Sequence, residues 1–213
     1  MGKFFRGQNM KVIALCGRSK AGKDFVADRL IHMSKNLRIQ RGLTEVIYPK
    51  FERYSMASPL KRLLAEVLNT TEPQLEEHKE LHRQQLITLS ERLKEIVPDI
   101  WCRALQNRIH NCEPFADVLI ITDVRYYIEV GYLKQIMKPE DLMFIRVERL
   151  KEQQGCGYQL EEFLEPHRLY NGEMPDDMPV EMWLDLHKEM IEDILEFVFP
   201  GKGAVERRCQ ADF

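Results

Sequence analysis

KVIALCGRSKAGKD, residues 11–24, joins an apolar run to a glycine-containing turn. The run at 11–16 predicts a buried parallel strand, because strands covered on both faces are apolar throughout. Residues 22–35 carry apolar side chains at helical spacing with charges between them, which predicts a helix. The stretch therefore predicts a buried strand, a tight turn and a helix in direct succession.

The turn matches the pattern GxxxxGK in the strand–turn–helix context that a phosphate-binding loop requires. Glycines let the backbone N–H groups point inward, and the helix N-terminus adds a partial positive charge. Lysine at the seventh position can then reach the β- and γ-phosphates of ATP. The predicted ATP-binding residues are Gly17, Arg18, Ser19, Lys20, Ala21, Gly22, Lys23 and Asp24. Asp24 stands where most such loops carry Ser or Thr, and its carboxylate is also a ligand for Mg²⁺.

A second acid follows another apolar run. Residues 117–122 read DVLIIT and predict a buried strand, and Asp123 and Arg125 come directly after it. Asp123 at such a strand end predicts a second contact to Mg²⁺, and Arg125 predicts a bidentate phosphate contact, so both join Lys23 as catalytic candidates. In the alternative, Asp123 caps the next helix and Arg125 pairs with Glu129.

The remaining pattern alternates strands with helices, which predicts an α/β fold with a mainly parallel central sheet between layers of helices. Weaker strands are expected at 45–48 and 54–57, and a stronger one at 142–147. Helices are expected at 58–69, 73–97, 98–109, 125–137 and 181–199. Residues 148–179 break the pattern and predict a lid-like insert, with Arg146, Arg149, Lys151 and Arg168 as candidate lid cations. The expected organisation is one domain, 1–213, with a core at 11–147 and 181–199 and an acceptor-binding helical region at 58–110.

Several cations of the helical region could bind an anionic acceptor. Lys61 follows Ser58 and Pro59 in the first turn of a predicted helix, where the dipole disfavours a cation unless an anion lies nearby. Arg83 and Lys94 lie 11 residues apart, near three helical turns, and share a face. Arg103 follows the next predicted helix start. For each residue the alternative is a solvated surface position.

The composition limits the partners. The net charge of −3 provides no basic field for a polynucleotide, and no apolar run is long enough for a membrane span. The five cysteines form no CxxC pair, which indicates a reducing compartment. The first ten residues contain no apolar stretch typical of a signal peptide. We therefore expect a cytoplasmic protein that is not bound to a membrane or to a nucleic-acid polymer.

Four motifs in order, GRSKAGKD, SPLKRLLAE, RxxLxxLSExxKxxxPDxW and DVRYYIE, resemble the phage-type deoxynucleoside monophosphate kinases over about two-thirds of the chain. The resemblance implies a P-loop kinase fold and transfer of phosphate from ATP with Mg²⁺ to a deoxynucleoside monophosphate. It implies that Arg83 and Arg125 hold the acceptor phosphate and that Asp24 and Asp123 serve the metal. A virus-encoded enzyme in the host cytoplasm and a homodimer are both compatible with it.

Two differences separate the chain from that family, which has glycine at the place of Ser90 and arginine at the place of Lys94. The segment after Val147 also shows no clear fifth strand. The chain is similar to animal-type phosphomevalonate kinase as well, through its GKD loop, its PLK segment and Cys102-Arg103. Glu129 after DVR favours the nucleotide kinase. A nucleotide-binding switch protein with little turnover is the third alternative.

Overall fold

The structure, a computed structural model of the 213-residue chain, describes residues 10–18, 20–41, 45–112, 116–148, 167–170, 180–200 and 206–207. It divides into two compact units. The first contains Met1–Tyr54 and Cys112–Phe213, and the second contains Ser55–Asn111. The helical region expected at 58–110 falls within the second unit.

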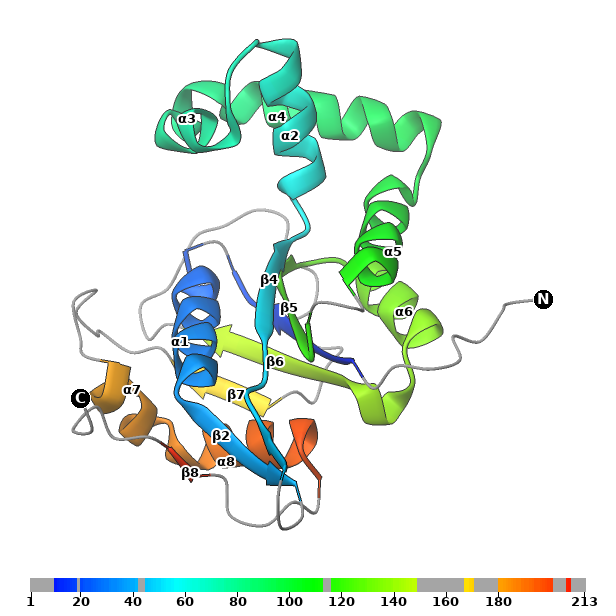
Figure 1. The fold of residues 1–213 in the computed structure, drawn as a ribbon. Helices are drawn as coiled ribbons and strands as arrows, with labels where there is room; N and C mark the ends of the chain where they lie inside the picture. Colours follow the sequence, from blue (N-terminus) through cyan, green and yellow to red (C-terminus); the bar gives the residue numbers. More distant parts are fainter. Residues whose placement is uncertain are drawn as a thin grey trace. The chain divides into compact units, whose positions relative to one another are not determined.

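A five-stranded sheet in the order β4-β5-β1-β6-β7 forms the centre of the first unit (Figure 1). The strands are β1 (Lys11–Cys16), β4 (Phe51–Ser55), β5 (Val118–Val124), β6 (Leu142–Glu148) and β7 (His167–Tyr170). The pairs β1–β5, β1–β6 and β6–β7 are all parallel. Helices flank this sheet, so the predicted α/β class with a mainly parallel sheet is confirmed. The parallel strands bring the ends of β1 and β5 to one edge, where the sequence places its two candidate acids.

Apolar residues of β1, β5 and β6 pack against helices α1 (Lys23–Lys35), α7 (Val180–Leu186) and α8 (Lys188–Val198). Ile13 and Leu15 of β1 and Val26 and Leu30 of α1 are fully buried in this core. Helix α6 (Tyr127–Ile136) buries Val130 and Leu133, and the 3-10 turn η1 (Pro139–Asp141) leads into β6. The burial of β1 and α1 holds the loop between them in a fixed frame.

The second unit contains α2 (Ser58–Val67), α3 (Glu72–Glu77), α4 (Lys79–Ile96) and α5 (Ile100–Cys112). Leu64 and Leu75 form a small core, and Leu86 and Leu89 of α4 pack against it. The Trp101 indole donates a hydrogen bond to Ser90 Oγ at 3.0 Å, joining α4 to α5. Ser90 thus ties these two helices together.

Several predicted boundaries are wrong. The strand expected at 54–57 lies at Phe51–Ser55, and β2 (Leu37–Arg41) was not predicted; β2 pairs antiparallel with β3 (Glu45–Ile47) and β8 (Glu206–Arg207). The helix expected at 73–97 is two helices that meet at His78, and a capping box formed by Thr71 and Gln74 starts the first of them. The helix expected at 181–199 breaks at His187, whose ring stacks on Trp183.

Two further expectations are corrected. The pair Ser58-Pro59 predicts Ser58 as the cap of a helix with Pro59 at its first position, but Ala57 is the N-cap of α2 and Ser58 and Pro59 are its first helical residues. The segment expected as an insert without a fifth strand contains β7, which pairs with β6. The rest of 149–179 lies outside the described residues. No helix in the described ranges is long and apolar enough to cross a membrane.

Candidate active site

The loop between β1 and α1 is curled by residues with positive φ. Gly17 has φ 143°, Lys20 has φ 63° and Gly22 has φ 91°. Glycine reaches such values at little cost, whereas a residue with a Cβ is strained there. At Gly17 an added Cβ would also meet the carbonyl oxygen of Val147 at 2.3 Å. The motif glycines are therefore required by backbone geometry and by close packing against β6. Ser19 lies outside the described residues.

Helix α1 begins at this loop with its backbone N–H groups uncapped by any described side chain. The N-cap is Gly22, which has no side chain to accept a hydrogen bond. The backbone N–H of Val26 donates to the Gly22 carbonyl oxygen at 2.9 Å. The first N–H groups of a helix have no partner within the helix and attract anions. Because the loop curls onto this helix end, the arrangement fits a phosphate.

Lys23 lies at the start of α1, and its side chain points back into the loop. Its Nζ donates to the carbonyl oxygens of Gly17 (3.0 Å) and Arg18 (2.8 Å) and lies 3.5 Å from Asp123 Oδ1. The residue is only 5% exposed. Burial lowers the pKa of this amine below its ordinary value, although the nearby Asp123 carboxylate raises it in part. The ammonium group thus occupies the loop while loop carbonyls and one acid serve as its partners.

Asp123 owes its position to a bulge in β5. Ala14 is opposite Ile121, but Cys16 is opposite Val124, so Thr122 and Asp123 share the place opposite Leu15. Asp123 takes a left-handed conformation with φ 67°, which Asp tolerates better than most residues. Its Oδ1 accepts from Arg125 Nη2 at 2.9 Å and also faces Lys23. The bulge therefore brings one carboxylate oxygen between two cations.

Arg125 and Glu129 do not form the side-chain ion pair that the alternative interpretation expected. The Glu129 carboxylate accepts from the backbone N–H groups of Arg125 (2.7 Å) and Tyr126 (3.1 Å), which caps α6. The Arg125 guanidinium instead pairs with Asp123. Burial lowers the pKa of Arg125, but the charges of Asp123 and Glu129 outweigh it, so the pKa lies above its ordinary value. Arg125 is a permanent cation at the loop.

One atom of that cation lacks an acceptor. Arg125 Nε is buried and has no hydrogen-bond partner in the part of the chain that the structure describes. A buried donor without an acceptor costs free energy, about 1–3 kcal/mol. An incoming anion could supply the missing acceptor, and the planar guanidinium suits the paired oxygens of a phosphate.

Asp24 differs from its neighbour Lys23 in its exposure. Its side chain is 68% exposed, and Arg53 Nη1 of β4 lies 3.8 Å from its Oδ1. The same Arg53 nitrogen lies 2.9 Å from Asp28 Oδ1. Sequence reasoning missed Arg53, because β4 was predicted weakly and in the wrong place. No spacing in the sequence joins β4 to α1.

The predicted acceptor cations of the second unit have acidic partners. Lys61 pairs with Glu76 (2.5 Å), Arg83 with Glu80 (3.3 Å), and Arg103 with Asp99 (2.9 Å). The hydrogen bond from Arg103 lowers the pKa of Asp99. The Glu76 carboxylate of α3 is thus the nearby anion that offsets the cost of Lys61 in the first turn of α2, and no external anion is needed. Lys94 lies on α4 with Arg83, and a role of these four residues toward an acceptor stays a prediction.

The candidate lid cations are only partly described. Arg146 belongs to β6, and its Nε lies 2.6 Å from Glu148 Oε1. Arg168 belongs to β7, and its side chain is outside the described part. Arg149 and Lys151 also lie outside it. A lid role for these residues is therefore still a prediction.

Comparison with known proteins identifies the family. The model of the family described as phosphomevalonate kinase matches residues 15–139, which is more than half of the chain and includes the loop, Asp123 and Arg125. No curated protein matches the chain significantly. The match favours the phosphomevalonate kinase resemblance over the nucleotide kinase. Glu129, which favoured the nucleotide kinase, has a local role as the cap of α6. The chain belongs to the phosphomevalonate kinase family and is a kinase, an enzyme that transfers a phosphoryl group.

Proposed function

We propose that this protein transfers the terminal phosphoryl group of ATP to the phosphate of phosphomevalonate. The family match carries the choice of acceptor. The curled loop, the open end of α1 and Lys23 supply a donor site, and Arg125 supplies a second cation beside it. The same donor geometry would serve a nucleotide acceptor, so the acceptor rests on the family and the phosphoryl transfer rests on the loop.

In the proposed reaction an oxygen of the acceptor phosphate attacks the γ-phosphorus of ATP. The bond from that phosphorus to the β–γ bridging oxygen breaks, and ADP leaves. A phosphate monoester carries nearly two negative charges at neutral pH, so the attacking oxygen needs no general base. Lys23 would move from the loop carbonyls to the β- and γ-phosphates. Catalysis is then positioning and charge neutralisation.

Arg125 would hold the acceptor phosphate. Its buried Nε has no acceptor among the described residues, and its Nη2 is held by Asp123. A phosphate placed against this guanidinium would satisfy the unpartnered donor. The donor phosphates already have the loop N–H groups and Lys23. We therefore place Arg125 on the acceptor side of the transferred group.

The residues also fit Mg²⁺, which kinases use with ATP. No group of three or more His, Cys, Asp or Glu suited to a metal ion occurs within the described ranges. Mg²⁺ in kinases needs fewer, because one or two carboxylates join the substrate phosphates and water. Asp24 and Asp123 are two such carboxylates, at the start of α1 and at the end of β5. Bound there, the ion would offset negative charge on the phosphates.

An acceptor screen with ATP and Mg²⁺ tests the proposal. ADP release should be fast with phosphomevalonate and near background with each deoxynucleoside monophosphate. Unphosphorylated mevalonate is the matched control, since it lacks only the phosphate. Turnover with a deoxynucleoside monophosphate and none with phosphomevalonate would contradict the proposed acceptor. Tight ATP binding without transfer to any acceptor would indicate a nucleotide-binding switch instead.

A further inference from the structure

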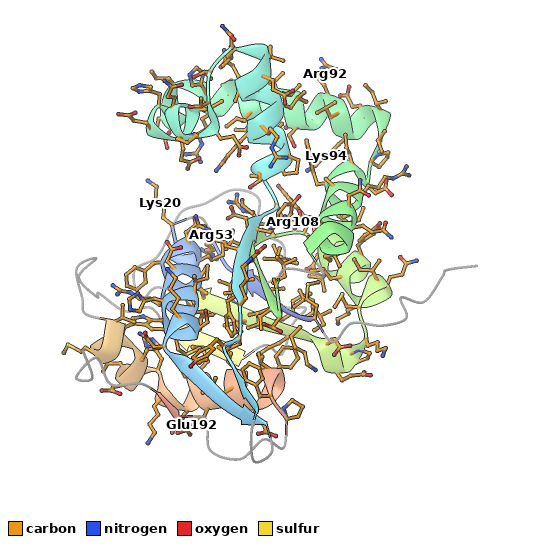
Figure 2. All side chains as sticks on the ribbon, viewed as in Figure 1. Lys20, Arg53, Arg92, Lys94, Arg108 and Glu192 are labelled. Atoms are coloured by element: carbon orange, nitrogen blue, oxygen red, sulfur yellow. The ribbon has the colours of Figure 1, made fainter. Side chains whose placement is uncertain are left out.

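Arg53 connects the strand β4 to the first two turns of α1. Its Nη1 donates to Asp28 Oδ1 at 2.9 Å and lies 3.8 Å from Asp24 Oδ1. Asp24 and Asp28 are four residues apart, so they lie on one face of the helix. Figure 2 shows Arg53 and Lys20 at the same end of α1. One guanidinium therefore serves two acids, and one of them directly follows the loop lysine.

The two contacts are unequal. The contact to Asp28 is a hydrogen bond, whereas 3.8 Å to Asp24 is beyond hydrogen-bond range and leaves only attraction between charges. All three side chains are at least 41% exposed, so water screens the pairs and makes them easy to exchange. Asp28 is thus the stronger partner of Arg53, and Asp24 is the partner that can leave.

We propose that Arg53 is a positioning residue that competes with Mg²⁺ for the Asp24 carboxylate, and that Asp28 limits this competition by holding Arg53. The inference rests on the proposed function in one respect, the contact of Asp24 with Mg²⁺. Without nucleotide, Arg53 neutralises part of the charge on Asp24. When the metal–nucleotide complex binds, Asp24 exchanges the arginine for the metal and Arg53 stays on Asp28.

Two other roles of Arg53 make different predictions. As a phosphate ligand, Arg53 would contribute to the binding of ATP even without metal. As a simple tie between β4 and α1, it would affect stability but not metal binding. Competition for Asp24 instead affects only the gain in nucleotide affinity that Mg²⁺ provides.

Calorimetry with a non-hydrolysable ATP analogue, with and without MgCl₂, measures this gain directly and needs no acceptor. Arg53→Gln should increase the metal-dependent gain about two- to fivefold, the range expected for loss of an exposed ion pair. Binding of the metal-free analogue should stay within about twofold of that of the wild type. Asp28→Asn should decrease the gain by a similar factor, because Asp24 would then be the one acidic partner left to Arg53 among the described residues.

The double variant separates an effect through Arg53 from the charge of Asp28 itself. In the Arg53→Gln background, Asp28→Asn should change the gain little, since the competitor is already absent. Glu192→Gln is the matched control; it removes one exposed carboxylate of an ion pair in α8, at the opposite end of the first unit from Arg53 (Figure 2). This control should leave the gain unchanged.

Three results would overturn the proposal: an unchanged gain in Arg53→Gln, a tenfold loss of metal-free binding in that variant, or an equal effect of Asp28→Asn in both backgrounds. The proposed function is tested separately. If the Arg53 inference fails but the wild type still phosphorylates phosphomevalonate, the proposed function stands. A wild type that binds the analogue with a metal-dependent gain but phosphorylates no acceptor would leave the inference intact.

Discussion

Gly17 lies against the backbone of Val147 with no room for a side chain, since a Cβ on Gly17 would meet the Val147 carbonyl oxygen at 2.3 Å. Gly17→Ala should therefore push β6 away from the loop and lower the free energy of unfolding, by about 1–3 kcal/mol for overpacking alone. Urea denaturation measures this change. Gly131→Ala is the matched control, because no atom of a packing neighbour among the described residues lies within 4 Å of a Cβ there. In the helix α6 it should stabilise the protein by roughly 0.5–1 kcal/mol.

Lys23 should make stability depend on pH. Its pKa is lowered by burial from the ordinary 10.5, so the unfolded chain holds this proton at pH values where the folded chain has lost it. Stability relative to Lys23→Met should then be constant below the lowered pKa, rise with pH above it, and level off near 10.5. Urea denaturation of both proteins across this range measures the difference. Lys138→Met, which removes an exposed lysine, is the control. The prediction would be contradicted if the stability of the wild type relative to Lys23→Met fell with rising pH.

Asp24→Asn tests the proposed metal contact. The amide keeps the size of the side chain but removes its charge, so Mg²⁺ should bind more weakly. The Mg²⁺ concentration for half-maximal turnover should rise, while saturating Mg²⁺ should restore part of the rate. A loss of rate that does not depend on Mg²⁺ concentration would instead indicate a structural role for Asp24.

Arg125→Lys tests the proposed contact between Arg125 and the acceptor phosphate. Lysine keeps the charge but loses the planar pair of donors. The kcat/KM for the acceptor should fall. The decrease should correspond to a loss of roughly 1–3 kcal/mol of transition-state stabilisation, the cost of one charge-assisted contact. Calorimetric binding of ATP without acceptor should change little. Equal losses in ATP binding and acceptor use would place Arg125 on the donor side or in folding.

Glu129 should matter for stability and not for the choice of acceptor. Its carboxylate caps α6 through the N–H groups of Arg125 and Tyr126. Glu129→Ala should cost about 0.5–2 kcal/mol of unfolding free energy, as loss of a helix cap does. The ratio of kcat/KM between phosphomevalonate and a deoxynucleoside monophosphate should stay constant. A changed ratio would show that Glu129 takes part in acceptor selection.

The sequence predicted the elements whose signals are local. The strands β1, β5 and β6 are short apolar runs, and α1 follows a glycine motif, so they were placed nearly at their observed boundaries. β7 was missed because it has four residues and obtains its stability from pairing with β6. β2 was missed for a similar reason, since it is held by pairing with two antiparallel partners, the nearby β3 and the distant β8.

The candidate site was predictable by residue but not by contact. Lys23, Asp123 and Arg125 follow from motif and strand position, and the structure brings the three together. Their pairing through one oxygen of Asp123 depends on a bulge, which leaves no mark in the hydrophobic pattern. The contacts of Arg53 with Asp24 and Asp28 depend on the packing of β4 beside α1. The choice between acceptors was beyond local patterns, and the proposed acceptor rests on the family match.

The bulge in β5 makes the length of that strand as important as the identity of its acid. Two residues, Thr122 and Asp123, occupy the place of one opposite Leu15. Deleting either would restore a regular ladder, with one residue opposite Leu15 and Val124 still opposite Cys16. An aspartate at that single position would lose the left-handed conformation that Asp123 takes in the bulge, and with it the conformation in which its carboxylate faces Lys23. The spacing between the apolar run 118–121 and Arg125 therefore belongs to the signature of the candidate site, and an alignment that opens a gap there would join residues that are not equivalent.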